Sequence, residues 1–193
     1  MPFIALAVAI AAALGGGATL AAENSLPGDA LWSYKVHVTE GIRAGFAPTA
    51  EAKAQAHIDA IETRMHETEE LAAEGRLDAS AQTNIEKNFD IHADAIAKKI
   101  AELQAAGDFE IAADIAARYQ AAIAARTAAL AQAETNAPEQ AEAALSPLLL
   151  KVRATLDQAS EMSASASAKA AANASGAKID ADVNIEAGVE TDI

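Results

Sequence analysis

The sequence predicts an all-α protein, an antiparallel up-down helical bundle of three long helices with a short helix before them and a fourth helix after them. Three observations support this fold class. Alanine, the strongest helix former, supplies 55 of the 193 residues. Apolar side chains recur at helical spacing through most of the chain. Helix breakers interrupt that spacing at regular intervals, at Gly45, Pro48, Gly75, Gly107 and Pro138.

Residues 1–22 are predicted to be a signal peptide or a transmembrane anchor. Residues 3–22 carry no charge, and twenty helical residues span roughly 30 Å, the thickness of a bilayer's hydrocarbon layer. A signal peptide would be cleaved after Ala21 or Ala22. The glycines at 15–17 weaken a continuous spanning helix, and no basic residue precedes the apolar run. Either interpretation places the rest of the chain outside the cytoplasm, membrane-anchored or, after cleavage, secreted or periplasmic.

The bundle domain is expected over residues 23–160, and it opens on the stretch LPGDALWSYK. Pro27 and Gly28 interrupt helix formation, and Asp29 is placed to cap a new helix that begins at Ala30. Trp32 has two interpretations, a place at the membrane–water boundary or packing over the end of the bundle. The candidate interaction residues are those of this stretch: Leu26, Pro27, Gly28, Asp29, Leu31, Trp32, Tyr34 and Lys35.

The first long helix is predicted from Ala50 to Glu74, with Thr49 as its N-cap and Gly75 after its end. Its apolar positions step by four and three residues, which is typical of a seam toward a partner helix. That seam consists of Ala54, Ile58, Ile61, Met65, Thr68 and Ala72. The acidic run that follows does not occupy one face and is interpreted as solvated surface: Glu67, Glu69, Glu70 and Glu74.

Two more long helices are predicted over residues 79–106 and 108–134, the first opened by Asp78 or Ser80 and closed by Gly107. The connections between the long helices are too short for parallel neighbours, so the helices should alternate in direction. The first of these two helices carries the stripe Ile85, Phe89, His92, Ile96, Ile100 and Leu103. The second carries Ile111, Ile115, Tyr119, Ile123 and Leu130.

A fourth helix is expected after Pro138, and Pro147 either restarts it with Ser146 as cap or kinks it. Its apolar side consists of Leu145, Leu148, Leu149, Val152 and Leu156. Residues 161–193 are small and polar and then acidic, with little apolar surface to offset the entropy of ordering. We therefore expect a disordered Ser/Ala-rich and acidic tail.

The opening motif and the long helix after it resemble an uncharacterised family of bacterial membrane-anchored helical domains, the domain of unknown function numbered 5667. The resemblance covers residues 25–130, with Ala30 where the family more usually has proline. It implies an extracytoplasmic, membrane-tethered helical domain and brings no catalytic residues. The matching positions are Leu26, Pro27, Gly28, Asp29, Leu31, Trp32, Lys35, Pro48, Ala52, Lys53 and His57.

Composition and motifs restrict the chemistry. The net charge is −14 without a basic cluster, so no nucleic-acid partner is expected. The chain has no cysteine, hence no thiol nucleophile and no thiolate metal site. The histidines His57, His66 and His92, with Glu62 or Glu70, could form a metal site, although the Glu-x-x-His spacing of metal-binding bundles is missing.

No catalytic, cofactor-binding or metal-binding residue is assigned from the sequence. The leading hypothesis is a non-enzymatic extracytoplasmic scaffold or protein-interaction module that meets an unknown envelope protein and contacts the membrane through its N-terminal segment. The alternative is a metal-sequestering helical bundle that uses histidines and carboxylates.

Overall fold

The structure, a computed structural model, describes residues 25–32, 35–36 and 47–189. Over these ranges the protein contains four long helices and no strand, which confirms the all-α class. The helices are α4 (Ala50–Ala73), α5 (Ala79–Ala106), α6 (Phe109–Asn136) and α7 (Glu139–Val189). The expected signal peptide or anchor and most of the short N-terminal helix, including Tyr34, lie outside the described residues.

The ends of α4 and α5 form as their capping residues predict. The Thr49 hydroxyl accepts a hydrogen bond from the amide of Ala52, and the Asp78 carboxylate accepts one from the amide of Ala81. Gly107 follows α5 with a φ of 88°, a left-handed conformation that glycine adopts without the strain of a side chain. Asp108, by contrast, opens α6 without a side-chain cap.

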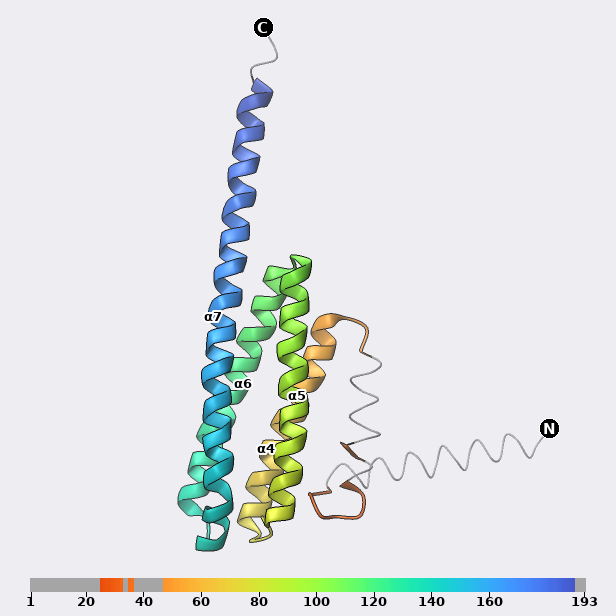
Figure 1. The fold of residues 1–193 in the computed structure, drawn as a ribbon, viewed down its shortest axis with the longest axis vertical. Helices are drawn as coiled ribbons and strands as arrows, with labels where there is room; N and C mark the ends of the chain where they lie inside the picture. The colour runs from red at the N-terminus through yellow and green to blue at the C-terminus, as the bar shows by residue number, and fades with distance from the viewer. Residues whose placement is uncertain (1–24, 33–34, 37–46, 190–193) are drawn as a thin grey trace, which may run out of the picture.

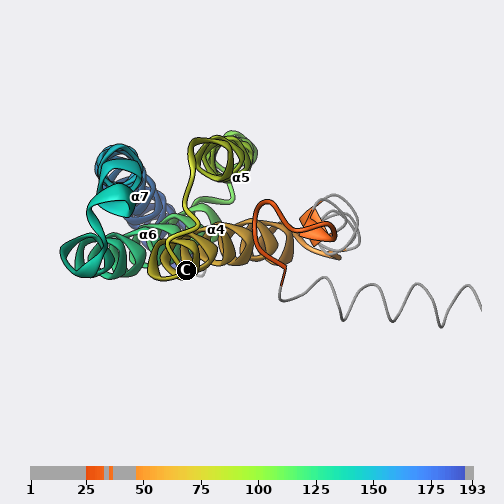
Figure 2. The ribbon, with the colours of Figure 1, turned by 90° about the horizontal axis from the view of Figure 1, so that it is seen from below.

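The four helices lie in two layers, with α4 and α6 in one and α5 and α7 in the other (Figure 2). The α4–α5 and α6–α7 connections lie at one end of the molecule and the α5–α6 connection at the other (Figure 1). Helix α6 packs closely along α7, whereas α5 and α7 touch only lightly. The light contact between α5 and α7 leaves a groove between them, which is described below.

The predicted apolar stripes form the core. Every member of the α4 seam is buried, and so is every member of the α5 stripe except the half-buried His92. Along α6 and α7, Ile111 and Leu156 are partly buried while the other predicted positions are fully buried. Tyr119 and Phe89 are among the largest fully buried side chains.

Helix α7 differs from its prediction. It runs through Pro147 as one helix, so the expected restart with Ser146 as cap is wrong. The Ser146 hydroxyl instead lies within hydrogen-bond distance of two acceptors, the carboxylate of Glu134 on α6 at 2.6 Å and the carbonyl of Glu142 one turn earlier at 3.1 Å, and its single proton serves one of them at a time. Helix α7 packs along α6, and this packing stabilises the helix although Pro147 cannot donate a backbone hydrogen bond.

Helix α7 continues to Val189, past residue 160 and past the ends of the other helices (Figure 1). Ala159, Ser163 and Ala166 are buried at helical spacing, so packing on the bundle continues into the expected tail. The Lys169 ammonium also donates to the side-chain oxygen of Gln104 on α5, at 2.6 Å. Alanine's helix propensity explains why a segment poor in apolar surface is helical.

None of the helices in the described part of the chain has the length and apolar character that crossing a membrane requires.

Candidate interaction site

The opening motif forms a tight turn before its first helical residue, Trp32. Gly28 has a φ of 99°, and the carboxylate of Asp29 accepts a hydrogen bond of 2.8 Å from the amide of Leu26. The amide of Asp29 donates back to the carbonyl of Leu26 at 2.9 Å. Asp29 therefore closes the turn, and the prediction that it caps a helix beginning at Ala30 is wrong.

Asp29 also ties the turn to the connection between α4 and α5. Its other carboxylate oxygen lies 2.7 Å from the guanidinium of Arg76, which also contacts Glu74 at 2.8 Å. The hydrogen bond from the Leu26 amide, followed by the one from Arg76, lowers the pKa of Asp29 below its ordinary value. The carboxylate is thus held in its charged form, in which it can accept from both donors.

Trp32 packs inside the protein. Its side chain is 6% exposed, and its indole Nε1 donates a hydrogen bond of 3.1 Å to Oε2 of Glu67 on α4. The guanidinium carbon of Arg64 lies 5.4 Å from the centre of the Trp32 ring, a cation–π distance. Of the two interpretations of Trp32, packing on the bundle is the one that the burial supports, although the contact is with the flank of α4.

Lys35 contacts the same carboxylate. Its ammonium lies 2.5 Å from Oε1 of Glu67 and donates more weakly to the carbonyl of Ser25, at 3.4 Å. Arg64 completes the arrangement from α4, with Nη1 2.9 Å from Oε2 of Glu67. We call Trp32, Lys35, Arg64 and Glu67 the Glu67 cluster; all four are buried. Since a buried charge is costly without its partners, the cluster holds the motif against α4.

Sequence reasoning missed two members of this cluster. Glu67 was assigned to the solvated acidic run, yet it is 2% exposed, so that assignment is wrong for this residue. Arg64 was not singled out, although it is fully buried. One signal was present: Arg64 lies three residues after Ile61 and four before Thr68, on the apolar face of α4. A charge on that face indicates a buried partner.

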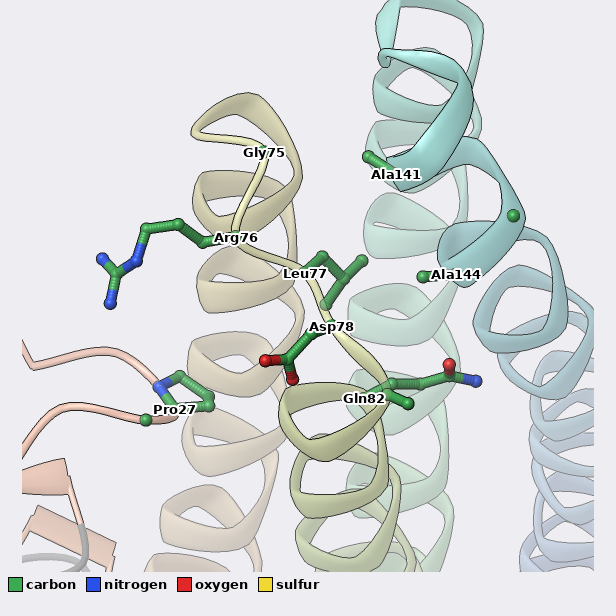
Figure 3. Close-up of a pocket in the computed structure, with 11 residues that line it drawn as sticks. Pro27, Gly75, Arg76, Leu77, Asp78, Gln82, Ala141 and Ala144 are labelled. Atoms are coloured by element: carbon green, nitrogen blue, oxygen red, sulfur yellow. The ribbon is translucent and has the colours of Figure 1, made fainter.

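A hollow of about 720 Å³ separates the motif, the α4–α5 connection and the start of α7 (Figure 3). The Arg76 side chain extends away from Ala141 and Ala144, on the side of the motif (Figure 3). The polar side chains that line this hollow already have structural roles: Arg76 binds Asp29, Asp78 caps α5, and Gln82 donates a hydrogen bond to Glu86. The hollow thus gathers no set of side chains suited to acid–base or nucleophilic catalysis.

A second hollow, of about 400 Å³, lies between the motif and α5. We call it the motif groove. Asn84 and Asn88 contribute side-chain amides, Lys87 a charge, and Ile91 an apolar side chain that is 52% exposed. Leu31 of the motif is also exposed. The lining residues are Gly28, Asp29, Trp32, Asn84, Lys87, Asn88 and Ile91.

The structure brings together two of the three histidines considered for a metal site. Nδ1 of His57 and Nδ1 of His92 are 2.9 Å apart, so one ring donates and the other accepts. Desolvation lowers the pKa of both, and for His92, with added repulsion from His57 and Arg64, the pKa falls to about 4. His66 instead contacts Glu69 and Glu70 on the surface of α4. No group of three potential metal ligands occurs among the described residues.

Comparison with known proteins gives no assignment, because no family model, no curated protein and no solved structure matches this chain.

Proposed function

We propose that this protein is a non-enzymatic extracytoplasmic scaffold, an up-down helical bundle that presents a protein-binding surface at a fixed orientation to its opening motif. The observation that carries this proposal is the Glu67 cluster. It attaches the motif, which directly follows the apolar leader, to the middle of α4 through buried polar contacts. The extracytoplasmic location rests on the leader's composition and on the family resemblance.

The attachment has two points. The Glu67 cluster holds Trp32 and Lys35 to α4, and the ion pair between Asp29 and Arg76 holds the turn to the α4–α5 connection. A segment attached at two places cannot pivot freely about either. The motif therefore keeps one orientation relative to the bundle, which is the property that a scaffold needs.

The motif groove is the face we propose for partner binding. It lies beside the two attachment points, so its shape depends on both the motif and α5. Interfaces commonly combine an apolar anchor with polar groups around it. Ile91 supplies exposed apolar surface in the groove, and Asn84 and Asn88 supply side-chain amides. The expected partner is an envelope protein with an apolar contact residue flanked by hydrogen-bonding groups.

Site-specific photo-crosslinking tests this proposal. A photoreactive amino acid would replace Ile91 in the full chain, expressed in its host cell, and Leu150 would serve as the matched control. Leu150 is also an exposed aliphatic residue, 70% exposed, but lies on α7 away from the motif. We expect a discrete crosslinked protein from position 91 and none from position 150. The absence of an adduct at position 91, or the same adducts from both positions, would contradict the proposal.

A further inference from the structure

An elongated groove lies between α5 and α7, and nothing described so far uses it. Two adjoining hollows, of about 300 and 290 Å³, share Ala97, Glu161 and Met162 in their linings. We call their union the α5–α7 groove. Its walls come from α5 and α7, and Tyr119 of α6 contributes to the first hollow from the other layer.

Polar bridges join the two helices toward both ends of the groove, and Gln104, a partner in one of them, also lines it. At one end the ammonium of Lys151 lies 2.6 Å from a carboxylate oxygen of Asp90. At the other, Lys169 donates to Gln104, also at 2.6 Å. The span from residue 90 to residue 104 of α5 is roughly 21 Å at 1.5 Å per residue. Side chains that join α5 to α7 therefore stand toward both ends of the groove.

Tyr119 lies at the bottom of the groove. The residue is 1% exposed, and its hydroxyl makes no hydrogen bond within the described part of the chain. Buried tyrosine hydroxyls usually have a partner. Desolvation, followed by the charges of Asp94 and Asp90, raises the pKa of Tyr119 above its ordinary value, so the phenol stays protonated. The hydroxyl opens onto the groove, where it can form a hydrogen bond with a polar ligand or with water.

The charge of the groove is negative on both walls. Asp94 on α5 and Glu161 on α7 line it, and neither forms an ion pair with another described residue. Neither lysine nor arginine lines it, while Ala97, Ile100 and Met162 give it apolar surface. A ligand that matches these groups has cationic ends and a hydrocarbon chain between or beside them.

We propose that the α5–α7 groove binds a linear aliphatic amine of the diamine or polyamine class. The ammonium groups pair with Asp94 and Glu161, and the methylenes cover Ala97, Ile100 and Met162. The Tyr119 oxygen accepts a hydrogen bond from an ammonium group. A fatty acid or another anion would be repelled by both carboxylates. A lysine side chain of another protein carries the same alkylammonium group, so the test includes it.

Isothermal titration calorimetry of the full chain with spermidine and with 1,5-diaminopentane, near physiological salt, tests the proposal. Asp94→Asn and Glu161→Gln are the groove variants, and Glu142→Gln is the control. Glu142 is an exposed acid at the start of α7, outside the groove, and its substitution changes the net charge by the same amount. We expect each groove variant to bind spermidine roughly tenfold more weakly, and the control less than about twofold more weakly.

Tyr119→Phe keeps the ring in the core and removes only the hydroxyl. It should retain the helical circular dichroism spectrum. It should bind spermidine about threefold more weakly, because it lacks one hydrogen bond to an ammonium group. Nα-acetyl-lysine amide should bind more weakly than either free amine, because it has one ammonium group for two carboxylates. Tighter binding of the lysine derivative would overturn the assignment to a free amine.

Two further results would overturn the proposal altogether. One is the absence of measurable binding of both amines. The other is an equal loss of affinity in Asp94→Asn, Glu161→Gln and Glu142→Gln, because non-specific attraction to an acidic protein depends on the total charge and not on where it lies.

Discussion

The indole nitrogen of Trp32 donates a hydrogen bond to the carboxylate of Glu67, which lies 35 residues further along the chain. This contact joins the opening motif to the buried face of α4. Because Lys35 and Arg64 contact the same carboxylate, one side chain organises the whole attachment.

Substitution of Glu67 should lower stability more than substitution of any exposed acid on the same helix. Glu67→Gln leaves two buried cations without their carboxylate, and we expect the free energy of unfolding to fall by about 3 kcal/mol. Urea unfolding followed by circular dichroism measures it. Glu70→Gln, at a largely exposed position on α4, is the matched control and should cost less than about 0.5 kcal/mol. Equal losses in the two variants would show that Glu67 is not part of a buried cluster.

Trp32→Phe should separate the indole hydrogen bond from the packing of the ring. The variant keeps an aromatic ring but removes the donor to Glu67, so a loss of roughly 1–2 kcal/mol in the free energy of unfolding is expected. In a double-mutant cycle with Glu67→Gln, the two losses should be strongly non-additive. Additive losses would mean that the two side chains do not interact.

Stability should fall as the pH decreases through the range set by His57 and His92. Both histidines have folded-state pKa values below 6.5, and that of His92 is about 4, so the unfolded chain binds protons first. The contribution of the two neutral histidines to the free energy of unfolding is complete above pH 6.5 and is lost progressively as the pH falls toward 4. The expected decrease in the free energy of unfolding is roughly 2 kcal/mol, after allowance for partial exposure.

The matched variant for this pH dependence is His92→Phe. It removes the more strongly shifted group and the Nδ1 contact to His57, while Arg64 and Lys99, the nearby cations, remain. Its free energy of unfolding should vary less between pH 7 and pH 4 than that of the wild type. The same slope in both proteins would assign the acid sensitivity to other groups.

Two glycines should respond differently to substitution by alanine. Gly107 has a φ of 88° at the end of α5, and an added Cβ would meet no atom within 4 Å. The cost of Gly107→Ala is therefore backbone strain alone, about 1 kcal/mol in the free energy of unfolding. Gly176 lies within α7 and also has open space around it, so Gly176→Ala should be neutral or stabilising. Thermal unfolding of the two variants checks both signs.

Much of the helical core could be predicted because it depends on local signals. Thr49, Asp78 and Gly107 mark helix ends through their own backbone and side-chain chemistry, and the spacing of Ile58, Ile61 and Met65 indicates a buried face. These signals act over one or two turns. They can therefore be recognised in the sequence without knowledge of the rest of the fold.

The candidate sites depend on contacts that no local pattern contains. Glu67 resembles its exposed acidic neighbours in sequence, and only Trp32 and Lys35, more than thirty residues away, make it a buried residue. The α5–α7 groove depends on the separation of two helices, which the bridges from Lys151 and Lys169 help to set. The sequence does not predict the length of α7, because small buried residues such as Ala166 add little apolar area and so give a weak signal.

The most direct test of the account is the quenching of tryptophan fluorescence by acrylamide, because Trp32 is the single tryptophan of the chain. We predict a blue-shifted emission and weak quenching in the wild type. In Glu67→Ala, emission should shift to the red and quenching should increase several-fold, while circular dichroism shows the helices retained. Strong quenching of the wild type, at the level of the unfolded chain, would show that the motif is not held against α4 and would contradict the fixed attachment on which the proposed function depends.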